Sequence, residues 1–78
     1  MSVSVEEIKK IVGLQLGTRK VEKSSRLIED LEAESMDIVN IIAVIESRFN
    51  IVIEEEDLPN IRTVADLVIQ IQNQLQNS

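Results

Sequence analysis

Three stretches of the chain carry apolar residues at spacings of three and four, and this periodicity constrains the fold more than any other sequence feature. A helix with such spacing buries one face, so three helices sharing one core are expected. The one strand-like run, Ile51-Val52-Ile53, has no second run to pair with and is predicted to be an extended connector. The stripe of the first stretch comprises Val5, Ile8, Ile11, Val12 and Leu16, and that of the third comprises Val64, Leu67, Val68, Ile71 and Leu75. In the second stretch, Met36, Val39, Ile42, Ala43 and Phe49 mark one face, and Ile38, Ile41, Val44 and Ile45 broaden it.

Capping residues set the expected ends of the first helix. Ser4 and Glu7 have the spacing of a capping box, which predicts that the helix begins at Val5. Gly17 is placed to end it in the left-handed conformation. Residues 18–34 contain no glycine, no proline and no clean periodicity, and they are expected to form a long ordered loop. The residues expected to pin this loop to the core are Val21, Leu27, Ile28 and Leu31.

The second helix is expected to begin at Ser35 and to end at Asn50, which tolerates the left-handed conformation. Its many apolar residues predict a central helix, buried around much of its circumference. A short helical turn is expected from Asp57 to Ile61, and Thr63 with Asp66 should cap the last helix. The prediction is an all-α fold in a single domain, residues 1–78: a small antiparallel helical bundle of three main helices plus one short helix, with a long loop between the first two helices.

The charge of the chain narrows its expected partners. The 78 residues include 8 basic and 14 acidic side chains, for a net charge of −6. Phosphate backbones repel such a chain, and the lone aromatic residue, Phe49, offers no stacking platform for bases. Nucleic acid is therefore not expected as a partner, whereas proteins with basic surfaces are.

Neither cysteine nor histidine occurs in the sequence. Their absence removes thiol nucleophiles, Ser-His-Asp and Cys-His arrangements, disulfides and the usual zinc sites. We therefore expect no enzyme activity and no bound metal, and any thiol has to come from outside the chain. The longest wholly apolar run, Ile41 to Ile45, is too short to span a membrane, and the N-terminus has no signal-peptide pattern, so the cytoplasm is the expected location.

Acidic residues gather around Ser35. Residues 1–26 hold six bases and three acids, whereas residues 27–78 hold two bases and eleven acids. These acids form either a solvated surface or a docking surface for basic partners. Ser35 itself is either a helix N-cap or a chemical handle, and composition does not separate the two. The acids between Arg26 and Arg48, with no base among them, are Glu29, Asp30, Glu32, Glu34, Asp37 and Glu46.

The segment from Leu27 to Asp37 resembles the prosthetic-group attachment region of acyl carrier proteins. The usual core of that region is Asp-Ser-Leu, preceded by a Glu-Asp-Leu-Gly stretch. The resemblance covers nearly the whole chain, and the size, acidity and helix order agree with it. Beyond the attachment region it runs through Glu46, Phe49, Ile51-Val52-Ile53, the acidic Glu54 to Asp57, and Ile61 to Asp66.

The resemblance implies that Ser35 carries a covalent 4'-phosphopantetheine arm, transferred from coenzyme A by a separate magnesium-dependent phosphopantetheinyl transferase. The arm would bring its own thiol and carry acyl intermediates as thioesters in fatty acid, polyketide or related lipid biosynthesis. Glu34 and Asp37 would help to recruit the transferase, and Glu46 would join them in docking acyl-transferring and condensing enzymes that have basic surfaces. The apolar residues Met36, Val39 and Ile42 would flank the arm. A monomer is expected.

Several positions depart from the usual pattern of the family. Glu34 replaces the Asp before the attachment serine, Met36 replaces Leu, and Glu32 stands where Gly is usual. Exposed positions where Glu is common in housekeeping fatty-acid carriers are instead Asn40, Ser47 and Arg48. These departures favour a specialised carrier. The alternatives are an aminoacyl or peptidyl carrier, a non-carrying acidic interaction module in which Ser35 is only a cap, and, more remotely, a small hydrolase without a base to activate Ser35.

Overall fold

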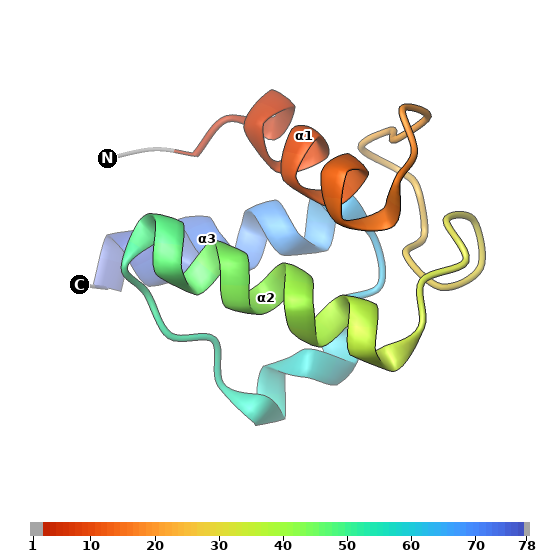
Figure 1. Cartoon of the computed structure of the whole chain (residues 1–78). Helices are drawn as coiled ribbons and strands as arrows, with labels where there is room; N and C mark the ends of the chain where they lie inside the picture. The colour runs from red at the N-terminus through yellow and green to blue at the C-terminus, as the bar shows by residue number, and fades with distance from the viewer. Residues whose placement is uncertain (1–2, 78) are drawn as a thin grey trace.

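A computed structural model describes residues 3–77 and contains four helices joined by irregular segments (Figure 1). They are α1 (Val5–Leu16), α2 (Ser35–Phe49), the short 3₁₀ helix η1 (Glu55–Asn60) and α3 (Val64–Asn77). No strand occurs within residues 3–77, and Ile51 to Ile53 are an extended connector. The predicted all-α bundle, with three main helices, one short helix and a long loop after the first helix, is confirmed.

The three main helices share one core, and α1 lies antiparallel to the other two. In Figure 1, α1 runs in one direction across the molecule, and α2 and α3 both return in the other. Helix α1 packs closely against both α2 and α3. The prediction that the second helix is the central one is wrong, because α1 is the helix whose backbone approaches both others.

The core consists almost entirely of Ile, Leu and Val. Most of the first and third predicted stripes are buried, as expected. On α2 the predicted face is only partly right: Met36, Val39 and Ala43 are exposed, whereas Ile41, Ile42 and Ile45 are buried as expected. The fully buried side chains are Ile8, Val12, Leu27, Ile41, Ile45, Val64, Leu67 and Ile71.

The long loop, residues 17–34, is held against the start of α3 by main-chain hydrogen bonds. Leu27 N–H donates to the Arg62 carbonyl at 2.8 Å, and Val64 N–H donates to the Ser25 carbonyl at 3.1 Å. Val21 and Leu27 are buried as expected, but Ile28 is 55% exposed, so its predicted anchoring role is wrong. These bonds explain how a segment without regular structure stays ordered.

The helix ends follow the predicted caps with one exception. Gly17 and Asn50 end α1 and α2 with φ angles of 68° and 55°, both left-handed. Ser4 precedes α1, but its side chain makes no capping hydrogen bond. Glu7 does not complete the predicted capping box, because its Oε2 accepts a hydrogen bond from Arg48 Nε at 2.7 Å. The first helix is therefore tied to the end of the second.

The start of α3 has the predicted capping box. Thr63 Oγ1 accepts from Asp66 N–H at 3.1 Å, and Asp66 Oδ2 accepts from Thr63 N–H at 3.0 Å and from Arg62 N–H at 2.9 Å. The short helix η1 begins two residues earlier than predicted. Pro59 lies near its end.

Candidate functional site

Ser35 is the first residue of α2, and it is exposed. Glu34, not Ser35, is the N-cap residue, and Asp37 Oδ2 accepts a hydrogen bond from Glu34 N–H at 2.9 Å. Within residues 3–77 no group hydrogen-bonds to the Ser35 hydroxyl. The interpretation of Ser35 as an N-cap is therefore wrong, and its hydroxyl is available for reaction.

The position at the start of α2 suits an attached anionic group. The first N–H groups of a helix lack partners within the helix, and the helix dipole adds partial positive charge there. A phosphodiester on Ser35 would lie in this favourable field.

The acidic run around Ser35 is partly neutralised at its far end. Arg26 Nη2 lies 3.1 Å from Asp30 Oδ1, and Arg26 Nε lies 3.8 Å from Glu29 Oε2. Hydrogen bonds from Arg26 lower the pKa of the Asp30 carboxyl. Among residues 3–77, Glu32 and Glu34 have no basic partner within 4.0 Å. Within this run, unpaired negative charge therefore lies next to Ser35.

Apolar side chains also reach the surface beside Ser35. Met36 is 67% exposed and Val39 is 54% exposed, so both are free to contact an arm or a partner. Ile42 does not belong to this surface, because it is buried in the core. The prediction that Ile42 flanks the arm is wrong.

A crevice of about 290 Å³ opens within one helical turn of Ser35, next to Ile38 of α2. Its walls come from α2, the long loop, η1 and the two residues after η1, and they are largely apolar. The sequence analysis missed this crevice, because it assigned Ile28 to the core and because the approach of η1 to Ile28 and Ile38 depends on the fold. Its lining residues are Ile28, Glu29, Ile38, Leu58, Pro59, Ile61 and Arg62.

Glu46 has a structural contact that sequence reasoning missed. Its Oε2 accepts a hydrogen bond from Ile53 N–H at 2.8 Å, in a half-buried position. This bond holds the extended connector against α2. The predicted docking role of Glu46 stays a prediction, and the carboxylate would have to serve both purposes.

Glu32 adopts a backbone conformation that favours glycine. Its φ angle is 57°, in the left-handed region, three residues before Ser35. A non-glycine residue there carries strain of order 1 kcal/mol. The loop therefore turns at this position towards α2 at a cost that the glycine usual in the resembled family would avoid.

Neither a metal-binding cluster nor a membrane-spanning helix is found among the described residues. Within residues 3–77 no group of three or more acidic side chains is arranged to hold a metal ion. No helix in the same range is both long enough and apolar enough to cross a membrane.

Comparisons with known proteins agree with this geometry. The family model described as "Phosphopantetheine attachment site" matches residues 6–71. An acyl carrier protein of Chlamydia caviae is 38% identical over 68 residues, which cover 85% of this chain and 88% of the relative. One from Helicobacter hepaticus is 39% identical over 69 residues, covering 86% of this chain and 91% of the relative.

A solved structure supports the fold independently. The crystal structure of an acyl carrier protein from Thermotoga maritima matches with a TM-score of 0.79 at 24% sequence identity, covering 94% of this chain and 87% of that chain. Proteins of this family are carriers rather than catalysts, and they are modified by phosphopantetheinyl transferases and work with other enzymes. The chain belongs to the acyl carrier protein family, and it carries acyl groups on a 4'-phosphopantetheine prosthetic group.

Proposed function

We propose that Ser35 is the residue that receives the 4'-phosphopantetheine arm. The observation that carries this proposal is the free, exposed hydroxyl of Ser35 at the start of α2, where Glu34 and Asp37 carry out the capping in its place. The Ser35 oxygen would become the ester oxygen of the phosphodiester, stabilised by the positive end of α2. The thiol of the bound arm supplies the thioester chemistry that a chain without cysteine lacks.

Intact-mass analysis tests this assignment. We expect a broad-specificity phosphopantetheinyl transferase with coenzyme A to add one phosphopantetheinyl group to the full chain. The addition should be lost in Ser35→Ala and kept in Ser47→Ala, a matched control at an exposed serine of the same helix. Modification that persists in Ser35→Ala would contradict the assignment.

The apolar crevice beside Ile38 favours an acyl cargo over an aminoacyl or peptidyl one. A polar cargo gains nothing from an apolar lining, whereas each methylene moved out of water contributes about 0.8 kcal/mol. An acyl chain on the arm would fold back into this crevice. Thioesters of fatty or polyketide intermediates are therefore the favoured cargo, and the polar cargo of an aminoacyl or peptidyl carrier is the alternative.

The surface around Ser35 is the proposed docking site for the transferase and for acyl-transferring and condensing enzymes with basic surfaces. Exposed Met36 and Val39 would supply apolar contact, and Glu34 and Asp37 would attract basic side chains. Such pairs mainly govern the encounter rate, so docking should weaken as salt rises. We infer a monomer acting in the cytoplasm.

We also propose that this is a specialised carrier, because Asn40, Ser47 and Arg48 lower the negative charge of α2. A housekeeping ketoacyl synthase should then use it poorly, and Asn40→Glu should improve that use. Arg48→Glu alone is a poor test, because it would place two carboxylates together at Glu7. It should be combined with Glu7→Arg, which restores the ion pair. Efficient turnover of the unmodified sequence at the same ionic strength would contradict the specialist interpretation.

A further inference from the structure

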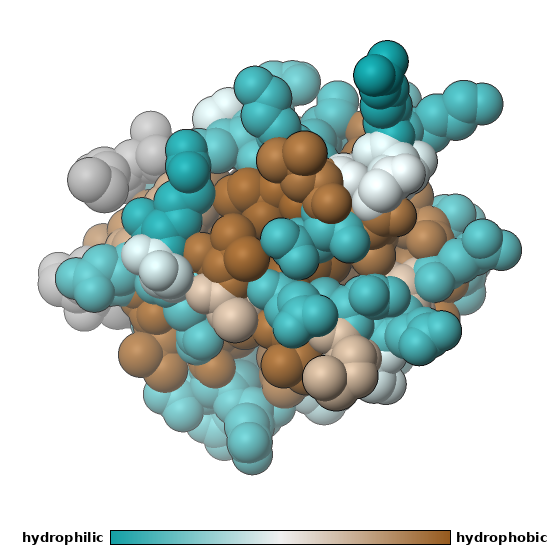
Figure 2. Space-filling view, in the orientation of Figure 1, coloured by the Kyte–Doolittle hydropathy of each residue, from teal (hydrophilic) through white to brown (hydrophobic). Residues whose placement is uncertain are grey.

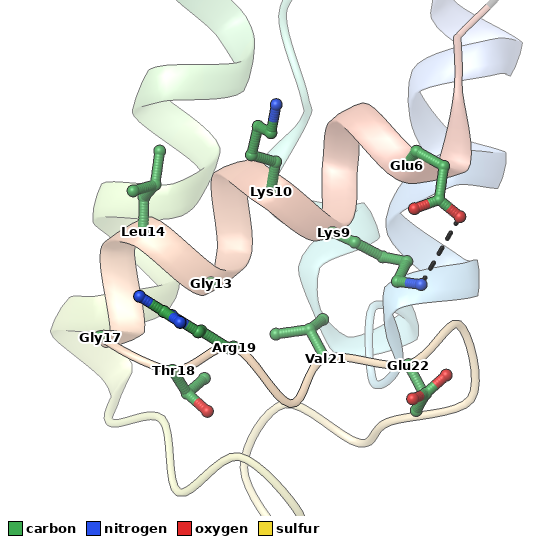
Figure 3. Close-up of a pocket in the computed structure, with 10 residues that line it drawn as sticks. All are labelled: Glu6, Lys9, Lys10, Gly13, Leu14, Gly17, Thr18, Arg19, Val21 and Glu22. Carbon is green, nitrogen blue, oxygen red and sulfur yellow. Dashed lines mark ion pairs between the residues drawn. The ribbon is translucent and has the colours of Figure 1, made fainter.

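A second surface feature lies away from the acidic residues of α2. One side of α1 and the loop after it enclose an open hollow of about 600 Å³, here called the α1 hollow, whose rim includes Lys9, Lys10, Leu14 and Arg19 (Figure 3). Its floor passes Gly13, where an added Cβ would lie 2.6 Å from the Thr18 carbonyl oxygen. The close approach of loop and helix that shapes the hollow therefore depends on the absence of a side chain on glycine.

Three bases, Lys9, Lys10 and Arg19, and two acids, Glu6 and Glu22, line the α1 hollow, so its lining is net positive although the chain as a whole is acidic. Lys9 pairs with Glu6 at 3.6 Å. In the part of the chain that the structure describes, Lys10 and Arg19 have no carboxylate within 4.0 Å, and the same holds for Lys20 just beyond the rim. These cations are not needed to balance charges within the fold, so they are available to an external carboxylate.

Leu14 is the most exposed large hydrophobic residue that the structure describes, at 76%. Figure 2 shows hydrophobic residues at the surface over α1, with hydrophilic residues around them. The core does not use Leu14, and the surface around Ser35 belongs to α2. An exposed leucine flanked by unpaired cations is typical of a small protein–protein interface, in which the apolar contact contributes affinity and the charges contribute specificity.

We infer that the α1 hollow docks an acidic segment of a partner protein, which places an apolar side chain against Leu14 and carboxylates at Lys10 and Arg19. Charge complementarity selects this occupant. A nucleic acid fits poorly because no aromatic side chain lines the hollow and the net charge of −6 repels a polyphosphate. The inference goes beyond the proposed function, because it requires neither the arm nor a reaction at Ser35.

The net charge of the α1 hollow is opposite in sign to that of the surface around Ser35, and in Figure 1 the end of α1 and the start of α2 lie towards the same end of the bundle. A basic partner surface would meet Glu34 and Asp37, and an acidic segment would meet the α1 hollow. The two docking events therefore use different partner chemistry and respond differently to substitutions on α1.

The test uses the full chain labelled with ¹⁵N and a short synthetic peptide in which one leucine is flanked by glutamates. We expect chemical-shift changes confined to residues 9–22 and weakened by salt. Arg19→Gln should reduce affinity about two- to fivefold, the range for one exposed ion pair. Arg62→Gln, which removes the same charge outside the hollow, should leave affinity unchanged.

A double-mutant cycle tests the apolar contact. Leu14→Ser should weaken binding of the leucine peptide but not of the same peptide with serine in place of leucine, which gives a coupling between the two positions. Leu14 is exposed, so this variant should keep its fold, as its amide spectrum would verify. Zero coupling would reduce the hollow to a simple anion-attracting surface and overturn the inference.

Three other results would also overturn it: no shift changes with the peptide, changes centred on α2, or an equal loss in Arg62→Gln. Concentration-dependent shifts at residues 9–22 without any peptide would identify a second copy of this chain as the occupant. That result would replace the partner-protein assignment.

Discussion

Two glycines of α1 serve the fold for different reasons. Gly13 is in the helix, and an added Cβ would meet the Thr18 carbonyl oxygen at 2.6 Å, a main-chain atom that cannot move aside cheaply. Gly17 has open space around it but a φ angle of 68°. One position is restricted by contact and the other by backbone conformation.

We expect both Gly13→Ala and Gly17→Ala to lower the free energy of unfolding. At Gly13, crowding of about 1–3 kcal/mol should exceed the roughly 1 kcal/mol that alanine gains in a helix. At Gly17 the left-handed conformation should cost about 1 kcal/mol. Urea denaturation measures both. Ser47→Ala, at an exposed position of α2, serves as the neutral control, and a stabilised Gly13→Ala would show that the loop does not press on α1.

Glu32 has the left-handed backbone conformation of Gly17 but is not a glycine. Glu32→Gly should remove strain of about 1–3 kcal/mol and lose about 0.4–1 kcal/mol to the greater freedom of the unfolded chain. The expected net result is a stabilisation of between about 0 and 2.6 kcal/mol, measured as a shift in the urea midpoint. Asn50→Gly is the matched comparison, with a smaller expected gain because asparagine tolerates this conformation. A destabilised Glu32→Gly would mean that the Glu32 side chain contributes to the fold.

At the scale of the elements, periodicity predicted α1 and α3 well, because each buries one stripe against the core. It failed on α2, where Met36 and Val39 are as apolar as core residues but face solvent beside Ser35. Hydrophobicity alone does not distinguish a side chain buried by the fold from one kept exposed for a ligand or partner. The predicted capping box of Ser4 and Glu7 is absent for another reason. The Glu7 carboxylate accepts a hydrogen bond from Arg48, 41 residues away, and local spacing does not reveal this contact.

The capping box of α3 makes the stability of the bundle sensitive to acid. Main-chain N–H bonds from Arg62, and then those of Thr63, lower the pKa of the Asp66 carboxyl. Because the folded pKa is depressed, Asp66 contributes stability above its unfolded pKa of about 3.9, and this is lost as pH falls through the folded value. We expect Asp66→Ala to cost about 1 kcal/mol at pH 7 and progressively less below about pH 5.

Urea denaturation at several pH values checks this expectation. Asp30 also has a lowered pKa, through hydrogen bonds from Arg26, so the comparison should be repeated in an Asp30→Asn background. A difference between Asp66→Ala and the parent chain that stays constant down to pH 2 would show that ionisation of Asp66 is not the source of the effect.

At the scale of the whole molecule, the sequence pointed to Ser35 as the candidate attachment residue but not to the space around it. Ser35 was singled out by its resemblance to a family motif, and the free hydroxyl was visible only once the capping of α2 was known. The crevice is formed by segments far apart in the chain: the loop at Ile28, α2 at Ile38 and η1 at Leu58. No local sequence pattern predicts that these three segments come together, because their contact depends on how the loop and η1 pack across the start of α2.

The crevice leads to an expectation for the loaded carrier. An octanoyl chain on the arm should enter it and raise the melting temperature above that of the holo form. Burial of each methylene contributes up to about 0.8 kcal/mol. In a domain of this size each kcal/mol raises the melting temperature by about 4–8 °C, so even two buried methylenes are detectable by calorimetry. Ile28→Ser should reduce the gain, because Ile28 lines the crevice yet is 55% exposed and contributes little to the core. Equal melting of the holo and octanoyl forms would mean that the cargo stays in solvent, and it would favour the aminoacyl alternative over an acyl chain held by the bundle.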